Sequence, residues 1–306
     1  MKIAVLGANS FSGSAFVALA RQEGHDVLPM SRPTFDLVRS QERIGEALER
    51  FKPAAIVNYA ALNVVAESWK FYADYYLTNV IGVARLAERA SHLDSLERFV
   101  QVSTPEVYGS SDRKLLPTEP YNPSTPYAVS RAAADMHLEA MREAFGFPVY
   151  FTRTVNVYGP GQQPYRVIPK TVLKILRGEK LKLEGGGESA RSFIHVEDMA
   201  AGTLAVAHRG RAGVAYHFTT PDLTPIKELV SAICRLMDVS WEDVVEIVAD
   251  RPGKDRMYHL AGWQAEIEFG WKPKINLLEG LEETVAWFKA HAADYAGHSL
   301  EYEHRP

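Results

Sequence analysis

The sequence predicts an α/β protein built on a doubly wound parallel sheet, and two observations carry this prediction. Short apolar runs alternate with longer stretches of helical periodicity from residue 2 onward. The runs are apolar along their whole length, which is typical of strands that helices cover on both faces of a sheet. The predicted strands span residues 2–7, 26–30, 54–60, 98–104 and 148–156.

The second half of the chain has a different composition. After residue 158 it becomes richer in Gly and Pro, as in "YGPGQQP", "EGGGES" and "TTPDLTP". A helical stretch (192–208) and a strand-like stretch (213–220) interrupt this half, and we expect them to rejoin the first sheet. The chain would then form a sheet domain and a smaller, discontinuous substrate-binding domain. The expected domains are residues 1–158 with 192–222, and residues 159–191 with 223–306.

Composition excludes several classes of function. The net charge of −4 and the scattered Lys and Arg residues argue against nucleic acid as a partner. The ten histidines are dispersed without cysteine partners, so no metal site is expected. The single cysteine, Cys234, excludes an intrachain disulfide, fits a reducing compartment and is expected to be buried in the core. No apolar run is long enough to span a membrane and no targeting pattern is present, so we expect a cytoplasmic protein without a membrane partner.

A glycine loop follows the first predicted strand. "KIAVLG" ends in "GANSFSG", so Gly7 and Gly13 bracket a turn from strand to helix. Backbone amides at the start of a helix bind phosphate, and this arrangement is the usual cradle for a dinucleotide. A tight turn without a ligand is the alternative, but the position at the first strand favours cofactor binding.

The end of the second strand bears on which cofactor is bound. Folds that prefer NAD place an acidic residue there against the ribose hydroxyls, whereas this chain has Ser31 and Arg32. A hydroxyl and a guanidinium suit a 2′-phosphate, so the sequence favours NADP over NAD. Arg32 as a solvated loop cation remains the alternative.

A long helix is predicted at residues 126–145. Ser124 or Thr125 is the expected N-cap, and Pro126 suits the first helical position. The spacing of four places Tyr127 and Arg131 on one face of this helix. A phenol has a pKa near 10 and becomes a useful base only beside positive charge, which Arg131 would supply. An exposed aromatic residue beside a surface arginine is the alternative.

Two further polar residues follow an apolar strand. In "QVSTPEVYGS", Thr104 and Glu106 come at the carboxyl end of strand 98–104. Ligands of open α/β sheets bind at the carboxyl ends of the strands. We therefore expect Thr104, Glu106, Tyr127 and Arg131 to form one catalytic group.

These residues resemble the extended short-chain dehydrogenase/reductase superfamily, and within it the nucleotide-sugar 4,6-dehydratases. The resemblance covers nearly the whole chain and rests on eight blocks in family order. They are "GANSFSG", "NYAALNVVAESW", "YLTNVIGVARLAE", "STPEVYGS", "NPSTPYAVSRAAAD", "TRTVNVYGPGQ", "RSFIHVEDMA" and "RPGKDR". The resemblance implies a Rossmann sheet, a tightly bound NADP or NAD, a sugar-nucleotide substrate and a homodimer formed through helices at 67–90 and 127–145.

The resemblance also implies a reaction. Tyr127 would take the C4 hydroxyl proton of the sugar while the nicotinamide accepts the C4 hydride, with Thr104 hydrogen-bonded to that oxygen. Glu106 would remove the C5 proton as the C6 hydroxyl leaves, and the hydride would return to C6. The product would be a 4-keto-6-deoxy sugar nucleotide.

Further binding residues carry over position by position. The cofactor would meet the glycine loop, an adenine-contacting pair and a group beside its ring, and the sugar nucleotide would meet a second set rich in arginine. The implied cofactor contacts are Gly7, Ser10, Phe11, Gly13, Ser31, Arg32, Asp36, Leu37, Ala60, Ala61, Asn79, Tyr127 and Arg131. The implied substrate contacts are Asn156, Arg191, Arg251 and Lys254.

Three positions depart from the family pattern. Ser10 replaces the middle glycine of the phosphate loop, and Arg131 replaces the usual lysine. Pro105 stands where the dTDP-glucose dehydratases carry the aspartate that protonates the leaving hydroxyl. Proline cannot donate a proton, so Glu106 would have to act first as base and then as acid, as GDP-mannose dehydratases manage without an acid at this place.

Alternative functions remain open on the sequence. A 4-epimerase or a C4 dehydrogenase needs only Thr104, Tyr127, Arg131 and the cofactor, and Glu106 is the residue that distinguishes them from a dehydratase. A decarboxylase would need a basic pair for a C6 carboxylate, which the sequence does not display. A non-catalytic dinucleotide-binding sensor would have no reason to keep Thr104, Glu106 and Tyr127 together. The tail "HSLEYEHRP" is expected to be disordered.

Overall fold

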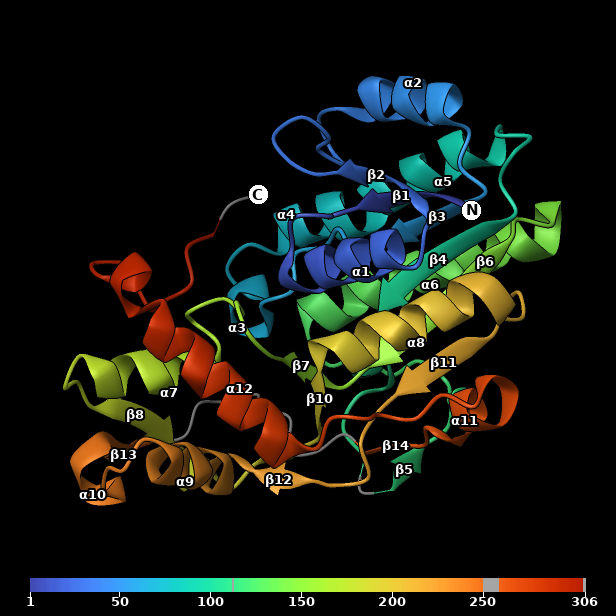
Figure 1. Cartoon of the computed structure of the whole chain (residues 1–306). Coiled ribbons are helices and arrows are strands. Elements are labelled where there is room, and N and C mark those ends of the chain that lie inside the picture. The colour runs from blue at the N-terminus through green and yellow to red at the C-terminus, as the bar shows by residue number, and fades with distance from the viewer. Residues whose placement is uncertain (112, 250–258, 305–306) are drawn as a thin grey trace.

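Six parallel strands form the central sheet, in the order β11-β6-β4-β3-β1-β2 (Figure 1). The structure is a computed structural model that describes residues 1–111, 113–249 and 259–304. The strands of the sheet are β1 (Lys2–Leu6), β2 (Asp26–Met30), β3 (Ala55–Asn58), β4 (Arg98–Ser103), β6 (Val149–Thr154) and β11 (Ala215–Phe218). The predicted doubly wound sheet is confirmed, and the strand-like stretch at 213–220 rejoins it as expected.

Helices cover both faces of the sheet. Side chains of β1 alternate between two cores: Ile3 and Val5 pack on one side, and Ala4 and Leu6 on the other. This alternation follows from the two-residue period of a strand. The first face carries α1 (Phe11–Gln22) and α8 (Val196–Arg209), and the second carries α2 (Gln41–Phe51), α5 (Val83–Ser91) and α6 (Pro126–Phe145) (Figure 1).

A smaller lobe has a core of its own. Three helices enclose Tyr158, Leu229 and Phe288, all nearly inaccessible to solvent. Cys234 is buried in an adjoining cluster, which confirms its predicted packing role. The lobe is built from α7 (Val167–Leu176), β8 (Leu181–Glu184), α9 (Ile226–Leu236), α10 (Trp241–Val244), β13 (Val245–Val248), α12 (Leu277–Ala290) and η4 (Ala292–Tyr295), with β8 and β13 parallel.

Short elements connect the lobes and border the site. Those on the sheet side are α3 (Val65–Ser68), α4 (Tyr72–Tyr76), η1 (Leu77–Gly82), η2 (Pro105–Tyr108), β5 (Lys114–Leu115), β14 (His259–Leu260) and α11 (Trp263–Phe269). The others are β7 (Asn156–Tyr158), η3 (Gly185–Gly187), β9 (Ala190–Arg191), β10 (Phe193–His195) and β12 (Thr224–Pro225). After the smaller lobe, the chain returns to the sheet lobe. There Phe269 of α11 packs on Tyr216 of β11, with ring centroids 4.8 Å apart.

A buried polar group fixes α6 to the sheet. Asp135 of α6 accepts a hydrogen bond from Ser103 (2.6 Å) and pairs with Arg153 of β6 (3.1 Å). Both charged side chains are at most 3% exposed. Arg153 also donates to the phenol oxygens of Tyr108 and Tyr121. Buried charges are tolerated when they are paired and hydrogen-bonded in this way, and the pairing gives α6 one position over β4 and β6.

The predicted helix at 126–145 matches α6. Thr125 is its N-cap and accepts a hydrogen bond from the Ala128 amide (3.1 Å), while Gly146 ends it in the left-handed conformation. The expectation of a disordered tail is wrong for residues 299–304. Leu300 is buried in the core of the smaller lobe, and the segment beyond it returns to the side of α4 (Figure 1).

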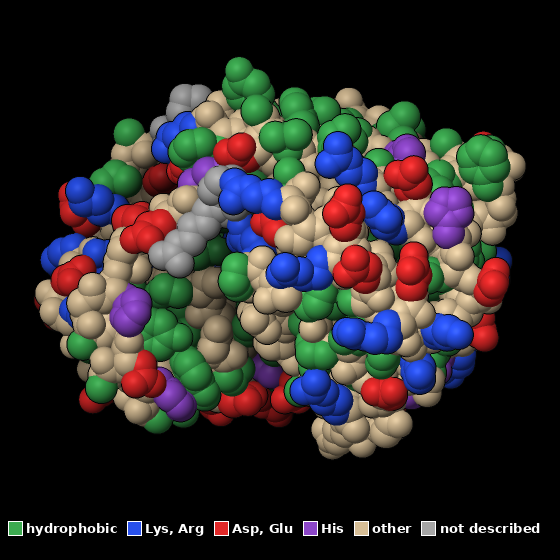
Figure 2. All heavy atoms as spheres, turned by 90° about the horizontal axis from the view of Figure 1, so that it is seen from above, with side chains coloured by type: hydrophobic (Ala, Val, Ile, Leu, Met, Phe, Trp, Pro, Cys, Tyr) green, Lys and Arg blue, Asp and Glu red, His purple; other side chains and the backbone are tan. Residues whose placement is uncertain are grey.

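The surface carries charges of both signs. Figure 2 shows Lys and Arg side chains interspersed with Asp and Glu over one face, and hydrophobic side chains gathered along its upper edge. Nothing among the described helices is long and apolar enough to cross a membrane. In the same parts of the chain, His, Cys, Asp and Glu side chains form no group of three or more that could hold a metal ion.

Candidate active site

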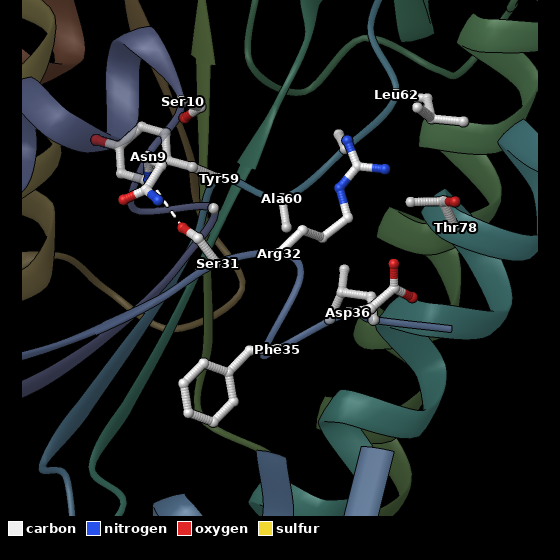
Figure 3. A pocket seen from close by; sticks show the side chains of 13 residues that line it. Asn9, Ser10, Ser31, Arg32, Phe35, Asp36, Tyr59, Ala60, Leu62 and Thr78 are labelled. Carbon is white, nitrogen blue, oxygen red and sulfur yellow. Dashed lines mark hydrogen bonds between the residues drawn. The ribbon is translucent and has the colours of Figure 1, made fainter. Parts of the chain in front are cut away.

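A cavity of about 290 Å³ opens at the carboxyl ends of β1, β2 and β3 (Figure 3). Most of the implied cofactor contacts line it, together with five residues that the sequence did not single out. The predicted residues in the lining are Gly7, Ser10, Ser31, Arg32, Asp36, Leu37, Ala60 and Ala61. The added residues are Asn9, Phe35, Tyr59, Leu62 and Thr78.

The glycine loop forms one wall of this cavity. Gly7 has a φ of +73°, which favours glycine, and a Cβ at Gly13 would lie 2.3 Å from the Gly7 carbonyl oxygen. Ser10 has an ordinary extended backbone (φ −71°, ψ 159°), so its departure from glycine costs no strain. Its hydroxyl caps α1 by accepting a hydrogen bond from the Gly13 amide (3.0 Å) and keeps its own hydrogen to donate.

The opposite wall follows β2. The Ser31 hydroxyl accepts a hydrogen bond from the Asn9 amide (2.8 Å), which ties this wall to the glycine loop. Figure 3 shows the Arg32 side chain extending across the cavity toward Leu62 and Thr78. The Asp36 carboxylate accepts hydrogen bonds from two backbone amides, those of residues 38 (2.8 Å) and 39 (2.9 Å), and so closes the turn before α2.

Asn79 lies behind the lining, and Phe11 and Gly13 also lie outside it. The Asn79 side chain is fully buried in η1. It accepts a hydrogen bond from the Leu62 amide (2.9 Å) and donates to the Leu62 carbonyl (3.0 Å) and to Ser130 (2.9 Å). Its amide therefore fixes Leu62, a lining residue, against α6.

The four predicted catalytic residues meet where β4 ends against the start of α6. Thr104 hydrogen-bonds the Tyr127 phenol, and its hydroxyl also accepts from the Glu106 amide (3.3 Å). Thr104 and Tyr127 are buried, and Glu106 is half-buried. Pro105 occupies the first position of η2, where a missing amide hydrogen costs nothing.

The environment of Tyr127 has opposing effects on its acidity. Burial raises the pKa of the Tyr127 phenol, the Arg131 charge lowers it, and the Glu106 carboxylate raises it. The hydrogen bond from Thr104 and the charge of Arg166 also lower it. The net pKa lies above the ordinary value for a phenol, so Tyr127 is protonated at neutral pH. The phenol needs additional positive charge to act as a base, and a nicotinium ring would bring it.

Arg131 lies outside the lining of the cavity. Its side chain is 2% exposed, and Nη2 donates to the Val102 carbonyl oxygen. Within the described residues, its Nε and Nη1 have no hydrogen-bond partner. Buried donors of this kind call for an acceptor. The ribose hydroxyls of a dinucleotide in the adjacent cavity would satisfy them, so the residues present fit such a cofactor.

The implied substrate contacts are more dispersed. Asn156 is exposed at the start of β7. Arg191 lies in β9, half-buried, and its Nη1 donates to the Ala190 carbonyl (2.7 Å). Neither residue lines the cavity of Figure 3. Arg251 and Lys254 lie outside the described residues.

Arg166 is a functional candidate that the sequence analysis missed. It caps the N-terminus of α7 in the smaller lobe and donates to the Asn63 side chain of the sheet lobe (3.1 Å). It is close enough to Tyr127 to lower the pKa of that phenol. No local pattern marks it, because only the folded chain brings α7 to the start of α6. Asn9 could have been inferred from the sequence, since it lies inside the glycine loop.

The chain is similar to known enzymes along most of its length. The model of the family described as "NAD dependent epimerase/dehydratase family" matches residues 3–219. A dTDP-glucose 4,6-dehydratase of Haemophilus influenzae is 30% identical over 330 aligned positions, which cover 94% of this chain and 98% of the relative. One from Streptomyces griseus is 36% identical, covering 77% of this chain and 72% of the relative.

Solved structures show the same likeness. DesIV, a dTDP-glucose 4,6-dehydratase from Streptomyces venezuelae solved with NAD, superposes with a TM-score of 0.90 at 31% identity, covering 96% of this chain and 98% of DesIV. A UDP-glucose 4-epimerase from Thermotoga maritima, solved with UDP-glucose, gives a TM-score of 0.87 at 26% identity and covers 95% of this chain and 99% of its own. The likeness includes both lobes.

The glycine loop yields a prediction with an internal control. Gly7 and Gly24 have similar positive φ angles (+73° and +79°), so alanine strains the backbone at either position by about 1 kcal/mol. Only at Gly7 would the added Cβ meet backbone, 2.7 Å from the Ala60 nitrogen; at Gly24 nothing lies within 4 Å. Gly7→Ala should lose most of the bound dinucleotide, measured chromatographically after denaturation, and Gly24→Ala should keep it. Equal dinucleotide content in the two folded variants would contradict this account of the loop.

Proposed function

Because the chain belongs to the NAD dependent epimerase/dehydratase family, we propose that it is a nucleotide-sugar 4,6-dehydratase that forms a 4-keto-6-deoxy sugar nucleotide. The relatives from Haemophilus influenzae and Streptomyces griseus support this activity. The observation that carries the proposal is the position of Glu106 beside Thr104 and Tyr127: its amide donates to the Thr104 hydroxyl (3.3 Å), and its carboxylate raises the pKa of Tyr127. A base for C5 thus lies beside the base for C4.

The residues of the site divide the reaction between them. A nicotinamide dinucleotide held by the glycine loop and the residues after β2 would supply the hydride acceptor for C4 and the hydride donor for C6. Tyr127 takes the C4 hydroxyl proton and is held by its hydrogen bond with Thr104. The resulting C4 ketone acidifies the C5 proton, which Glu106 removes as the C6 hydroxyl leaves. Pro105 supplies no acid, so Glu106 passes the proton it has taken to the leaving hydroxyl, which departs as water. When the hydride returns to C6, C5 takes a proton from solvent through Glu106, and Tyr127 releases to solvent the proton that it took from the C4 hydroxyl.

Arg131 takes the place of the family lysine in this scheme. Its charge lowers the pKa of Tyr127, and its contact with the Val102 carbonyl fixes the guanidinium at the end of β4. The two remaining donors would hydrogen-bond the cofactor ribose. A guanidinium is larger than an ammonium group but holds its charge more firmly in a buried site.

The cofactor is a nicotinamide dinucleotide, and we propose NADP. Ser31 and Arg32 line the cavity at the end of β2, where a 2′-phosphate would lie. DesIV was solved with NAD, so this preference would distinguish the chain from that neighbour. The dinucleotide recovered from the wild-type protein in the Gly7 and Gly24 comparison also identifies the cofactor.

The substrate is a sugar nucleotide. We propose that Asn156, Arg191, Arg251 and Lys254 bind it, with the arginines neutralising its diphosphate. Several neighbours were solved with such compounds, including UDP-glucose. The single cysteine and a substrate of this kind suit the cytoplasm, where we place the protein.

A 4-epimerase is the second candidate, and Pro105 favours it. Epimerisation needs no acid at C6, and the Thermotoga maritima epimerase shares the fold. Glu106 argues for the dehydratase, because an epimerase leaves C5 untouched.

We propose a homodimer on the evidence of an exposed apolar surface. The large side chains of this surface come from the residue after α3 and from α4, η1 and α6, and they are Trp69, Tyr72, Leu77, Ile81, Val129 and Met136. Contiguous exposed apolar surface is typical of an interface. Met136→Glu should therefore convert a dimer into a monomer in sedimentation equilibrium, whereas Ile267→Glu on α11, which is 73% exposed, should not. A wild-type monomer at micromolar concentration would contradict the dimer.

Replacing Glu106 tests its role as the C5 base. Glu106→Gln should still oxidise C4, which is visible as the absorbance of reduced nicotinamide, but should lose dehydration by about a hundredfold or more, because an amide cannot take the C5 proton. Tyr127→Phe serves as the control and should give neither signal. Dehydration by Glu106→Gln at the wild-type rate would mean that another residue is the base.

The cation beside Tyr127 predicts a pH effect. The phenolate is the active base, so the rate rises as pH passes through the pKa of Tyr127. Arg131 lowers this pKa, so Arg131→Met should move the rising limb of the kcat/KM profile to higher pH, by about one unit or more. Arg131→Lys keeps the charge and should hold the limb nearer its wild-type position. A profile unchanged by Arg131→Met would remove Arg131 from the activation of Tyr127.

A further inference from the structure

The last residues of the described chain join the two lobes beside the active site. We call residues 301–304 the strap. Leu300, just before it, is buried in the core of the smaller lobe. Glu301 pairs with Lys170 of α7 (2.6 Å), and the Tyr302 ring meets the Tyr165 ring edge-on, with centroids 5.2 Å apart. The strap thus begins firmly attached to the smaller lobe.

The strap ends on the sheet lobe, and His304 makes the contact. Its ring stacks on Phe71, with centroids 3.9 Å apart and planes 3° from parallel. Its Nε2 donates to the Asp74 carboxylate (2.8 Å), and its side chain is only 9% exposed. The Tyr302 hydroxyl lies 3.4 Å from Nδ1. These contacts fix the ring in both orientation and tautomer.

The seat of His304 lies directly behind the wall of the active site. Phe71 and Tyr75 pack in one apolar cluster with Leu62 and Tyr127. The Tyr75 ring stands edge-on to the Tyr127 ring, with centroids 6.2 Å apart and planes at 80°. The His304 ring lies nearly parallel to the Tyr75 ring, with centroids 6.3 Å apart. The rings of Phe71 and Tyr75 therefore lie between the strap and the proposed C4 base.

Tyr75 also shapes the neighbouring loop. Its hydroxyl donates to the Val64 carbonyl (2.6 Å) and accepts from the Val64 amide (3.2 Å). Leu62, two residues earlier, lines the cofactor cavity. A displacement of Tyr75 would therefore reach both the phenol of Tyr127 and the cavity wall.

We propose that His304 is a positioning residue for Tyr127, and that the strap, anchored on the smaller lobe, holds the aromatic wall behind the C4 base in place. The proposal rests on the proposed function, in which Tyr127 removes the C4 hydroxyl proton. His304 is not a lining residue of the cavity and acts through Phe71 and Tyr75. The Lys170 and Glu301 pair anchors the strap but has no part in this contact, and Glu301 is largely exposed.

Three variants separate positioning from anchoring. His304→Ala removes the stack on Phe71 and the bond to Asp74, and should lower kcat about tenfold with little change in KM, because a misplaced base slows the chemical step. His304→Phe restores the stack and should recover most of the rate. Glu301→Ala breaks only an exposed ion pair and should stay within about twofold of wild type.

An isotope effect gives a readout that stability alone would not move. With a sugar nucleotide deuterated at C4, His304→Ala should show a larger primary isotope effect than wild type, because oxidation at C4 becomes more rate-limiting, and His304→Phe should return it toward wild type. A His304→Ala variant with a lower melting temperature but unchanged kcat and isotope effect would show that the strap is merely structural and would overturn the proposal.

A second measurement does not need the reaction. Amide hydrogen exchange over residues 62–76 should accelerate in His304→Ala and in a chain lacking residues 301–306, stay slow in Glu301→Ala, and slow again in His304→Phe. If the wild type turns over no sugar nucleotide, the proposed function is wrong. The exchange pattern would still show whether the strap stabilises residues 62–76. Equal exchange in all variants would overturn the strap's role whatever the reaction.

Discussion

The site depends on the buried ion pair between Asp135 and Arg153. Burial lowers the pKa of the Arg153 guanidinium, but the charge of Asp135 and the two tyrosines raise it by more, so the group stays charged inside the protein. The pair links α6 to β6, and the bond from Ser103 to the same carboxylate links α6 to β4. Removing one partner of such a pair costs about 3 to 5 kcal/mol, because the other charge is left buried alone.

The catalytic arrangement follows from this attachment. Thr104 comes directly after Ser103 at the end of β4, and Tyr127 lies two helical turns before Asp135 on α6. With α6 fixed on the strand, Thr104 reaches the phenol and Arg131 reaches the Val102 carbonyl. The chemistry is thereby placed on rigid elements, while the cofactor cavity is formed by the loops after β1, β2 and β3.

Local patterns in the sequence were sufficient for the sheet, for the glycine loop and for α6, whose N-cap they narrowed to Ser124 or Thr125. The glycine loop, Ser31 and Arg32 directly follow the strands that position them, so their place at the cavity could be inferred from the residues. The family resemblance was needed for Asp36, Leu37, Ala60 and Ala61. Asn79 shows the limit of this reasoning: its place near the cofactor was inferred, but its bonds to Leu62 and Ser130 depend on the packing of η1 against α6. Arg166 and His304 reach the site from the smaller lobe and the tail, and no short-range pattern records such contacts. The hydrogen bonds and ion pair around Arg153 join residues of β4, α6 and β6, and no short-range sequence pattern indicates these contacts either.

The central claim is that Glu106 removes the C5 proton after C4 is oxidised, so that water is lost from C6. The most direct measurement is incubation with dTDP-, GDP-, UDP- and CDP-hexoses in deuterated water, followed by NMR and mass spectrometry of the product. The account predicts solvent deuterium at C5 and the loss of one water from the sugar. Inversion at C4 without deuterium at C5 would contradict it and would identify an epimerase.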